Sequence, residues 1–382
     1  MTVIRPQDVV EPLRATEDAS ETARSLTPHA VELLHRCGAT KLMTPSHLGG
    51  EETSPRDLIE AERLIAHGSP AASWVLMVCA AHSFIAGRFP EQARHEVWQR
   101  DPGMLIPGVP TPRGTCQKAP GGFVVDGRWP YASGADHGDW VMLGCRGVRN
   151  DADEPCRSHI VVVPKAEVGI DDTWFTLGMR GSGSKDVVVD GVFVPEHRAV
   201  EMLPAMNGVL EGVAEPLYRL PILPVLSTML MGTIVGMAER GLELYLDQAR
   251  ARRDAYSGRA KAESVGVQHR VAEASGELAS AWAMVQRNCD LFEQAMLAAP
   301  PMPIESRAEV RWNAAYAAEL CRRATGRLYG GAGAGAAHDS NVLQRVFRDV
   351  NTGVQHAALD LDVAAEIRGQ CLLGIELDDA MV

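Results

Sequence analysis

Apolar residues recur at alternating steps of four and three along three long stretches in the second half of the chain. One stretch carries Leu230, Ile234, Met237, Gly241 and Leu244, a second carries Leu278, Trp282, Val285, Cys289, Phe292 and Met296, and a third carries Val310, Ala314, Ala317, Cys321, Ala324 and Leu328. This period places one apolar stripe along each helix, and such stripes pack against one another. With a final helical stretch at about residues 341–372, the pattern predicts a four-helix bundle.

Residues 1 to about 105 are also predicted to be helical, because the same start signal occurs three times. Thr27-Pro28, Ser54-Pro55 and Ser69-Pro70 each place a capping hydroxyl before a proline at the first helical position. Gly38, Gly68 and Gly87 stand where these helices would end. The sequence therefore predicts a helical domain at the N-terminus.

Between these regions the chain is rich in proline, glycine and short β-branched runs. Asp126-Gly127 and Asp190-Gly191 are flanked by such runs and predict hairpin turns. Short strands with regular turn signals favour a small antiparallel barrel or sandwich. We therefore divide the chain into an N-terminal helical domain (1–105), a central β domain (106–205) and a C-terminal bundle (206–382).

Composition excludes several classes of function. The net charge of −12 comes without any basic stripe, which argues against a nucleic-acid partner. The eight cysteines include no CxxC pair, so neither a zinc site nor a disulfide framework is indicated, and we expect no metal. The N-terminus lacks the apolar core of a signal peptide, and no uninterrupted apolar run is long enough for a bilayer. We therefore expect a cytoplasmic protein without a membrane partner.

Common catalytic signatures are missing as well. No GxGxxG follows a strand in a βαβ unit, and no GxSxG elbow is present. The loop Gly181-Ser182-Gly183-Ser184 does offer backbone N–H groups and two hydroxyls, as a phosphate or a polar ring edge requires. The alternative for such a loop is an ordinary turn.

Four motifs carry a resemblance to a known family. They are Ser73-Trp74 followed by His82, RWPYASGADHGDW at 128–140, GMRGSGSKDVVVDGVFVP at 178–195, and LQRVFRDVNTGVQH at 343–356. Helices, then a β domain, then a bundle is the layout of the acyl-CoA dehydrogenase fold. Within that superfamily the chain resembles the oxygenase components of group D two-component flavin-dependent monooxygenases. The resemblance implies an α+β, mostly α, acyl-CoA dehydrogenase-like fold with a small central antiparallel β-barrel.

One position separates the two branches of this superfamily. In acyl-CoA dehydrogenases the glutamate base commonly lies eight residues after the aspartate of an Arg-Asp pair, which here is Ala357. A methyl group cannot accept a proton, so that base is missing at its usual place. The preceding residue, His356, can exchange protons near neutral pH, and the oxygenase relatives have a histidine there beside the flavin.

The resemblance also implies the site residues. His82 would lie across the substrate cavity from the flavin and take a proton from a substrate hydroxyl or amine. His356 would tune the flavin's peroxide or give a proton to the leaving oxygen, and the Ser133 hydroxyl would bond the N5/O4 edge of the flavin. The implied flavin-binding residues are Trp74, Tyr131, Ala132, Ser133, Ser182, Ser184, Arg253, Gly331, Ala332 and His356. The alternatives are core packing for Trp74, a carbonyl contact for His82, a turn at Ser133 and a surface ion pair for Arg253.

The implied function is that of an oxygenase using reduced FMN or FAD from a separate reductase. Oxygen would add at C4a, and the hydroperoxyflavin would hydroxylate a small aromatic, phenolic or polyketide-like substrate. The segment 202–225 would form a variable wall of the substrate cavity. The superfamily implies a homotetramer. Three alternatives stay open: an N-hydroxylase or nitroso-forming enzyme, an acyl-CoA dehydrogenase-type flavoprotein, and a flavin-binding or purely structural tetramer without turnover.

Overall fold

The N-terminal helices begin where the capping signals predict. The structure, a computed structural model, describes residues 5–150, 155–254, 257–299 and 301–377. The first helices are α1 (Val10–Arg14), α2 (Glu17–Ala23), α3 (Pro28–Arg36), α4 (Pro55–Gly68), α5 (Pro70–Ala86) and α6 (Glu91–Trp98). The hydroxyls of Thr27, Ser54 and Ser69 each accept a backbone N–H in the first turn of α3, α4 and α5. The three predicted caps are confirmed.

The central β domain is one seven-stranded sheet. Its strands are β1 (Gly108–Ala119), β2 (Gly122–Ala132), β3 (Trp140–Val148), β4 (His159–Pro164), β5 (Gly169–Asp171), β6 (Lys185–Pro195) and β7 (Ala199–Glu201), in the order β5-β6-β2-β1-β3-β4-β7. The predicted antiparallel pairing is wrong at one place, because β1 and β3 are parallel. No pairing among the described strands joins β5 to β7, so hydrogen bonds do not close a barrel. Instead the sheet folds over its own core, in which Val161 of β4 and Val187 of β6 are fully buried.

The two Asp-Gly pairs do not form the predicted hairpin turns. Asp126-Gly127 lies inside β2, Asp190-Gly191 lies inside β6, and the two strands pair with each other there. The register shifts between Val125 and Gly127, so the pairs face one another as an irregularity in the ladder. An Asp-Gly pair supplies the left-handed conformation that a bulge needs as readily as the one a turn needs, and Gly191 has a φ of 60°.

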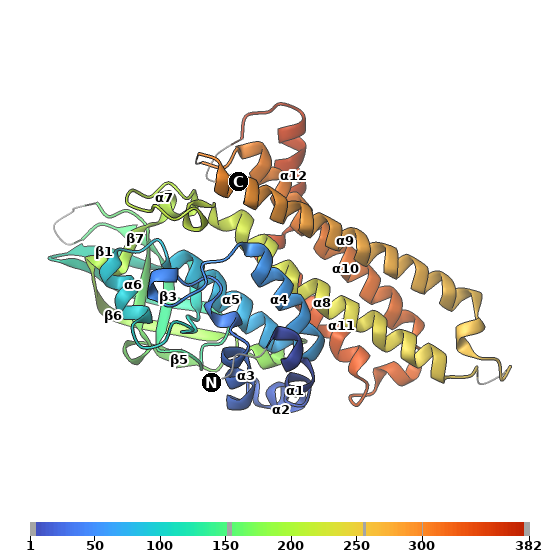
Figure 1. Ribbon diagram of the computed structural model, residues 1–382. Helices are drawn as coiled ribbons and strands as arrows, with labels where there is room; N and C mark the ends of the chain where they lie inside the picture. Colours follow the sequence, from blue (N-terminus) through green and yellow to red (C-terminus); the bar gives the residue numbers. More distant parts are fainter. Residues whose placement is uncertain (1–4, 151–154, 255–256, 300, 378–382) are drawn as a thin grey trace.

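Three long helices form the body of the bundle. After the short α7 (Met202–Met206) come α8 (Ile222–Ala251), α9 (Val265–Leu297) and α10 (Ile304–Gly331), which run side by side away from the β domain (Figure 1). Their predicted apolar stripes lie in one core, although Gly241, which contributes no side chain, and the partly buried Leu244, Trp282 and Met296 mark its border. By length and composition alone α8 could cross a bilayer, but 83% of its most apolar window is buried in the protein, as in a core helix.

The predicted final helix at 341–372 is broken. It consists of α11 (Val342–Gly353), the 3-10 turn η10 (Ala357–Leu359) and α12 (Leu361–Leu372). The side chain of Asn341 caps α11, that of His356 caps η10 and that of Asp360 caps α12. Capping by the side chains of His356 and Asp360 competes with a continuous helix. The apolar period of 341–372 therefore did not reveal that η10 and α12 each begin anew. α11 completes the bundle and α12 packs on α10.

A buried ion pair joins the N-terminal helices to the bundle. Arg240 of α8 donates to both carboxylate oxygens of Glu17 of α2 at 2.8 and 2.9 Å, and both side chains are less than 10% exposed. α2 also lies against the loop that contains Gly181, where an added Cβ would come within about 3.2 Å of Ser20. The pair therefore holds the helix that supports this loop.

Candidate functional site

A row of buried hydroxyls runs from α5 to the Gly/Ser loop. The Trp74 indole N–H donates to the Ser133 hydroxyl at 3.1 Å. Ser133 and Ser184 are joined by a 2.7 Å hydrogen bond between their Oγ atoms, and Ser184 and Ser182 by another of 2.7 Å. The structure therefore brings together Trp74, Ser133, Ser182 and Ser184, all predicted as flavin-binding from three separate motifs.

The backbone around Ser133 is shaped for this contact. Tyr131, near the end of β2, has a φ of 71°, and its ring is 66% exposed and lies edge-on to Trp174, with 6.3 Å between ring centroids. Ala132 is fully buried. Gly134 has a φ of 72° and packs on Val75 of α5. A left-handed Tyr131 turns the chain so that Ser133 points inward while the aromatic ring faces outward.

His82 lies in α5 with its tautomer fixed by the backbone. It is 3% exposed, and its Nδ1 lies 2.6 Å from the carbonyl oxygen of Ile106. A carbonyl can only accept, so Nδ1 carries the proton and Nε2 keeps its lone pair. Burial, and to a lesser degree the neighbouring His356, lower the pKa of His82 to about 4. The predicted carbonyl contact is present, and it leaves the second ring nitrogen free to act as a base.

His356 has the opposite tautomer. Its Nδ1 accepts the backbone N–H of Ala358 at 3.2 Å, so the proton of the neutral ring is on Nε2. The ring lies edge-on to Trp74, with 6.2 Å between centroids. Gly353, one turn earlier, leaves room for the indole, because a Cβ there would be 3.2 Å from Trp74. Burial lowers the pKa of His356 to about 4, so both imidazoles are neutral at pH 7.

The residues predicted to bind the phosphate end of the flavin do not contact the hydroxyl row. Gly331 and Ala332, at the end of α10, line a small hollow of about 100 Å³ at the C-terminal end of α8. Arg252 and Lys261 line the same hollow, whereas Arg253 is exposed and donates to the Gly258 carbonyl at 3.1 Å. The basic side chains in this hollow are thus those of Arg252 and Lys261. Sequence gave no signal to prefer Arg252 over its neighbour.

Asp349 holds the other end of the Gly/Ser loop and was missed as a site residue. Its buried carboxyl accepts the backbone N–H of Met179 at 2.6 Å, and Met179 has a left-handed φ of 54°. Gly178 packs so closely that an added Cβ would lie 2.3 Å from the Arg348 carbonyl oxygen. Burial raises the pKa of Asp349 to about 7.

This raised pKa predicts a pH-dependent stability. An unfolded aspartate loses its proton at a pH of about 4, whereas the folded protein keeps it to about 7. The free energy of unfolding should therefore fall as pH rises from about 4 to 7. Asp349→Asn keeps an oxygen acceptor for Met179 and should remove this part of the slope, measured as thermal midpoints across that range. The exposed Asp362→Asn is the control, and an unchanged slope in Asp349→Asn would contradict the assignment.

A groove of about 800 Å³ lies between the start of β1, the segment before β4, α7 and the start of α8. Part of the segment 202–225 lines it, as do the prolines at the start of β1: the residues include Pro110, Pro112, Met202, Leu203, Met206 and Leu223. Most of these side chains are apolar. The expected wall segment thus borders a groove, but none of the predicted catalytic residues lines it.

Comparisons with known proteins agree with the fold. Residues 228–361 match the family described as acyl-CoA dehydrogenase, C-terminal domain. The chain is 31% identical to a flavin-dependent monooxygenase, oxygenase subunit HsaA, of Mycobacterium tuberculosis, over 97% of this chain and 94% of the relative. It is 28% identical to the oxygenase component of p-hydroxyphenylacetate 3-hydroxylase of Acinetobacter baumannii, over 98% and 90%. Among solved structures, XiaF from Streptomyces sp. in complex with FADH2 and glycerol superposes with a TM-score of 0.91 at 27% identity, covering 97% of this chain and 94% of that one.

Proposed function

Because the chain belongs to the oxygenase components of two-component flavin-dependent monooxygenases, we propose that it hydroxylates a small phenol with reduced flavin from a separate reductase. The observation that carries this proposal is a pair of neutral histidines with opposite tautomers, the buried His82 and the partly exposed His356, of which His356 lies against Trp74 of the hydroxyl row. One imidazole can take a proton and the other can offer a hydrogen bond. The proposed hydroxylation uses both groups, one toward the substrate and one toward the flavin.

The hydroxyl row fits the polar edge of a flavin. Trp74, Ser133, Ser184 and Ser182 bring one donor hydrogen each, four in all, and three hydrogen bonds join them into the row. Among the described contacts one hydroxyl proton is therefore left for an external acceptor, such as a flavin nitrogen or carbonyl. When bound, reduced flavin supplies the activation of O2. These residues would hold its ring, with Tyr131 and Ala132 at its border.

We place the phosphate end of the flavin in the hollow of Arg252, Lys261, Gly331 and Ala332. That hollow is at the end of α8 farthest from the β domain (Figure 1). A flavin held at Ser133 would meet this hollow on a neighbouring subunit, which favours the homotetramer that the superfamily implies. Arg253 keeps a role only if its exposed guanidinium turns toward that neighbour.

His82 is the proposed base. Its Nε2 would take the proton of the substrate hydroxyl, because Nδ1 is committed to the Ile106 carbonyl. The lowered pKa of about 4 keeps Nε2 unprotonated at neutral pH, but it also makes the ring a weak base for a phenol, whose hydroxyl has a pKa of about 10. Nε2 therefore accepts a hydrogen bond from the substrate hydroxyl, and the proton moves to it as oxygen transfer draws electron density from the ring.

His356 is the proposed hydrogen-bond donor beside the flavin. Its Nε2–H is available, but a neutral ring with a pKa of about 4 holds no second proton to give at neutral pH. Of the two implied roles, the structure therefore favours donation of a hydrogen bond over donation of a proton. With Trp74 packed against it, the ring also excludes water.

The relatives named above favour a phenol, since one of them is a p-hydroxyphenylacetate hydroxylase. A dehydrogenase function is disfavoured, because Ala357 is exposed and offers no base. N-hydroxylation of an amine remains a prediction that the same assay tests. We propose that the enzyme acts in the cytoplasm.

The deciding experiment supplies chemically reduced FMN or FAD and O2 to the purified protein without a reductase. Phenols and aromatic amines are offered in parallel, and products gaining one oxygen atom are measured by mass together with hydrogen peroxide. We expect oxygenated phenols and little peroxide. Peroxide alone with every substrate would remove the proposal. So would reduction of bound oxidised flavin by an acyl-CoA in a separate run without O2.

Ser133→Ala tests the hydroxyl row in the same assay. The lost hydrogen bond should weaken reduced-flavin binding by about tenfold, which corresponds to about 1.4 kcal/mol. Peroxide released per O2 consumed should rise. Ser227→Ala removes a buried hydroxyl that bonds only within α8, so it is the matched control. Equal flavin affinity in the two variants would show that Ser133 does not contact flavin.

A further inference from the structure

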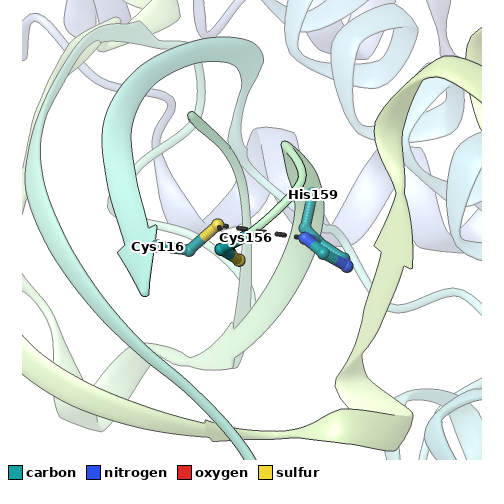
Figure 2. A group of neighbouring side chains, drawn as sticks. All are labelled: Cys116, Cys156 and His159. Carbon is teal, nitrogen blue, oxygen red and sulfur yellow. Dashed lines mark hydrogen bonds between the residues drawn. The ribbon is translucent and has the colours of Figure 1, made fainter. Parts of the chain in front are cut away.

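Two thiols and an imidazole converge at the edge of the β domain (Figure 2). Cys116 is in β1, Cys156 precedes β4 and His159 begins β4. The Cys116 sulfur is 3.9 Å from the Cys156 sulfur and 3.9 Å from His159 Nδ1, and all three atoms lie within 4.8 Å of one another. None of the three belongs to the hydroxyl row, and none has a part in the proposed hydroxylation.

The Arg157 carbonyl oxygen lies against the same three atoms. It is 3.6 Å from the Cys116 sulfur, 3.3 Å from the Cys156 sulfur and 2.7 Å from His159 Nδ1. Four potential donor atoms therefore surround one point, from two strands and the segment that leads into β4. Two S–H groups and one N–H group share the Arg157 carbonyl as their single acceptor. The hydrogen bond from His159 is strong, and the two from the thiols are weak.

We propose that Cys116, Cys156 and His159 bind a thiophilic divalent cation of the zinc class, with the Arg157 carbonyl at the fourth corner. In a tetrahedral zinc site, bonds of about 2.3 Å to sulfur and 2.0 Å to nitrogen put neighbouring ligand atoms about 3.5–3.8 Å apart. The observed 3.9 Å edges need only a small adjustment. The His159 N–H bond to Arg157 is exchanged for the metal bond on binding.

The charge of the ligands and the position of the groove also favour a cation at this cluster. Two thiolates neutralise a divalent cation, so the loaded cluster adds no net charge to the interior of the β domain. The nearby charges, Arg157 and Glu201, already pair with each other at 2.6 Å. Cys156, Arg157 and Glu201 also line the large groove, which gives an ion a path to the cluster.

The site would act as a clamp and not as a catalyst. Four protein ligands leave no open coordination position for a substrate, as in structural zinc sites. Cation binding would displace the thiol protons and join β1 to the start of β4. These strands are not direct neighbours in the sheet, because β3 lies between them.

The test adds Co²⁺ to the reduced, metal-free full chain. We expect thiolate-to-cobalt charge-transfer absorption, strong tetrahedral visible bands, displacement of both by one equivalent of Zn²⁺, and a higher thermal midpoint. Cys156→Ser is the main variant, because Cys156 is partly exposed and its loss should not prevent folding. It should weaken Zn²⁺ affinity at least about tenfold, and His159→Asn should do the same.

Cys371→Ser is the control, since Cys371 is another partly exposed thiol, in α12. It should bind Co²⁺ like the parent chain. Absence of the charge-transfer band in the parent chain, or equal bands in the Cys156 and Cys371 variants, would overturn the proposal. So would a mass loss showing that Cys116 and Cys156 form a disulfide in place of a metal site.

Discussion

His82→Gln is expected to lower phenol hydroxylation by roughly 10²–10⁴-fold, the usual contribution of a positioned base. Glutamine can still donate to the Ile106 carbonyl, but its amide cannot take the substrate proton. Flavin affinity should be nearly unchanged, because the hydroxyl row does not include this side chain. Stopped-flow product formation and reduced-flavin binding, measured on the same preparation, separate the two effects.

His356→Ala completes this test, with a different expected failure. Oxygen should still be consumed, but hydrogen peroxide should replace the hydroxylated product, because the hydrogen bond from Nε2 and the shelter of the ring are both lost. His269→Ala, an exposed histidine of α9, is the control for both variants. Unchanged coupling in His356→Ala, or an unchanged rate in His82→Gln, would refute the role assigned to that residue.

Glu17→Leu is expected to lower the free energy of unfolding by about 3–5 kcal/mol, because it leaves the buried Arg240 charge without its carboxylate. The double variant Glu17→Leu with Arg240→Met removes both charges of this pair. It should recover most of the loss, because Arg345, which also pairs with Glu17 at 3.4 Å, keeps Asp18 and Glu21 as partners. Denaturant unfolding of the single and double variants measures the coupling.

The exposed pair of Asp247 and Arg250 is the control for this measurement. Asp247→Asn should change the unfolding free energy by at most about 1 kcal/mol. A second effect is expected in Glu17→Leu, since α2 supports the Gly181 loop: reduced flavin should bind more weakly. If the double variant is as unstable as the single one, the loss comes from packing and not from an unpaired charge.

Helix starts were predicted correctly from the sequence, whereas features that depend on strand pairing were not. The caps at Thr27, Ser54 and Ser69 depend only on neighbouring residues, and all three are confirmed. Asp126-Gly127 was misread because a turn and a bulge need the same backbone conformation, and only the partner strand decides between them. The parallel pairing of β1 and β3 depends on the partner strand in the same way.

For the candidate site too, sequence motifs located residues, whereas features that depend on the folded backbone were not predicted. Motifs located Trp74, Ser133, Ser182 and Ser184, which the structure joins into one row. The tautomers of His82 and His356 could not be foreseen, because they depend on the folded backbone: the Ile106 carbonyl faces His82, and the Ala358 N–H turns back onto His356 in a capped turn. The cluster of Cys116, Cys156 and His159 was not foreseen for a related reason: without a CxxC pair no zinc site was indicated, and one of the two thiols comes from a strand 40 residues away from the other.

The interruption between α11 and α12 has a consequence for how such enzymes diversify. His356 stands on a short capped turn between Gly353 and Asp360, so its placement does not depend on the register of a long helix. A few residues of this turn could be exchanged, inserted or deleted while α11 stays packed on α8 and α12 stays packed on α10. New reactivity could thus evolve in the turn between α11 and α12 with little loss of stability in the helical bundle.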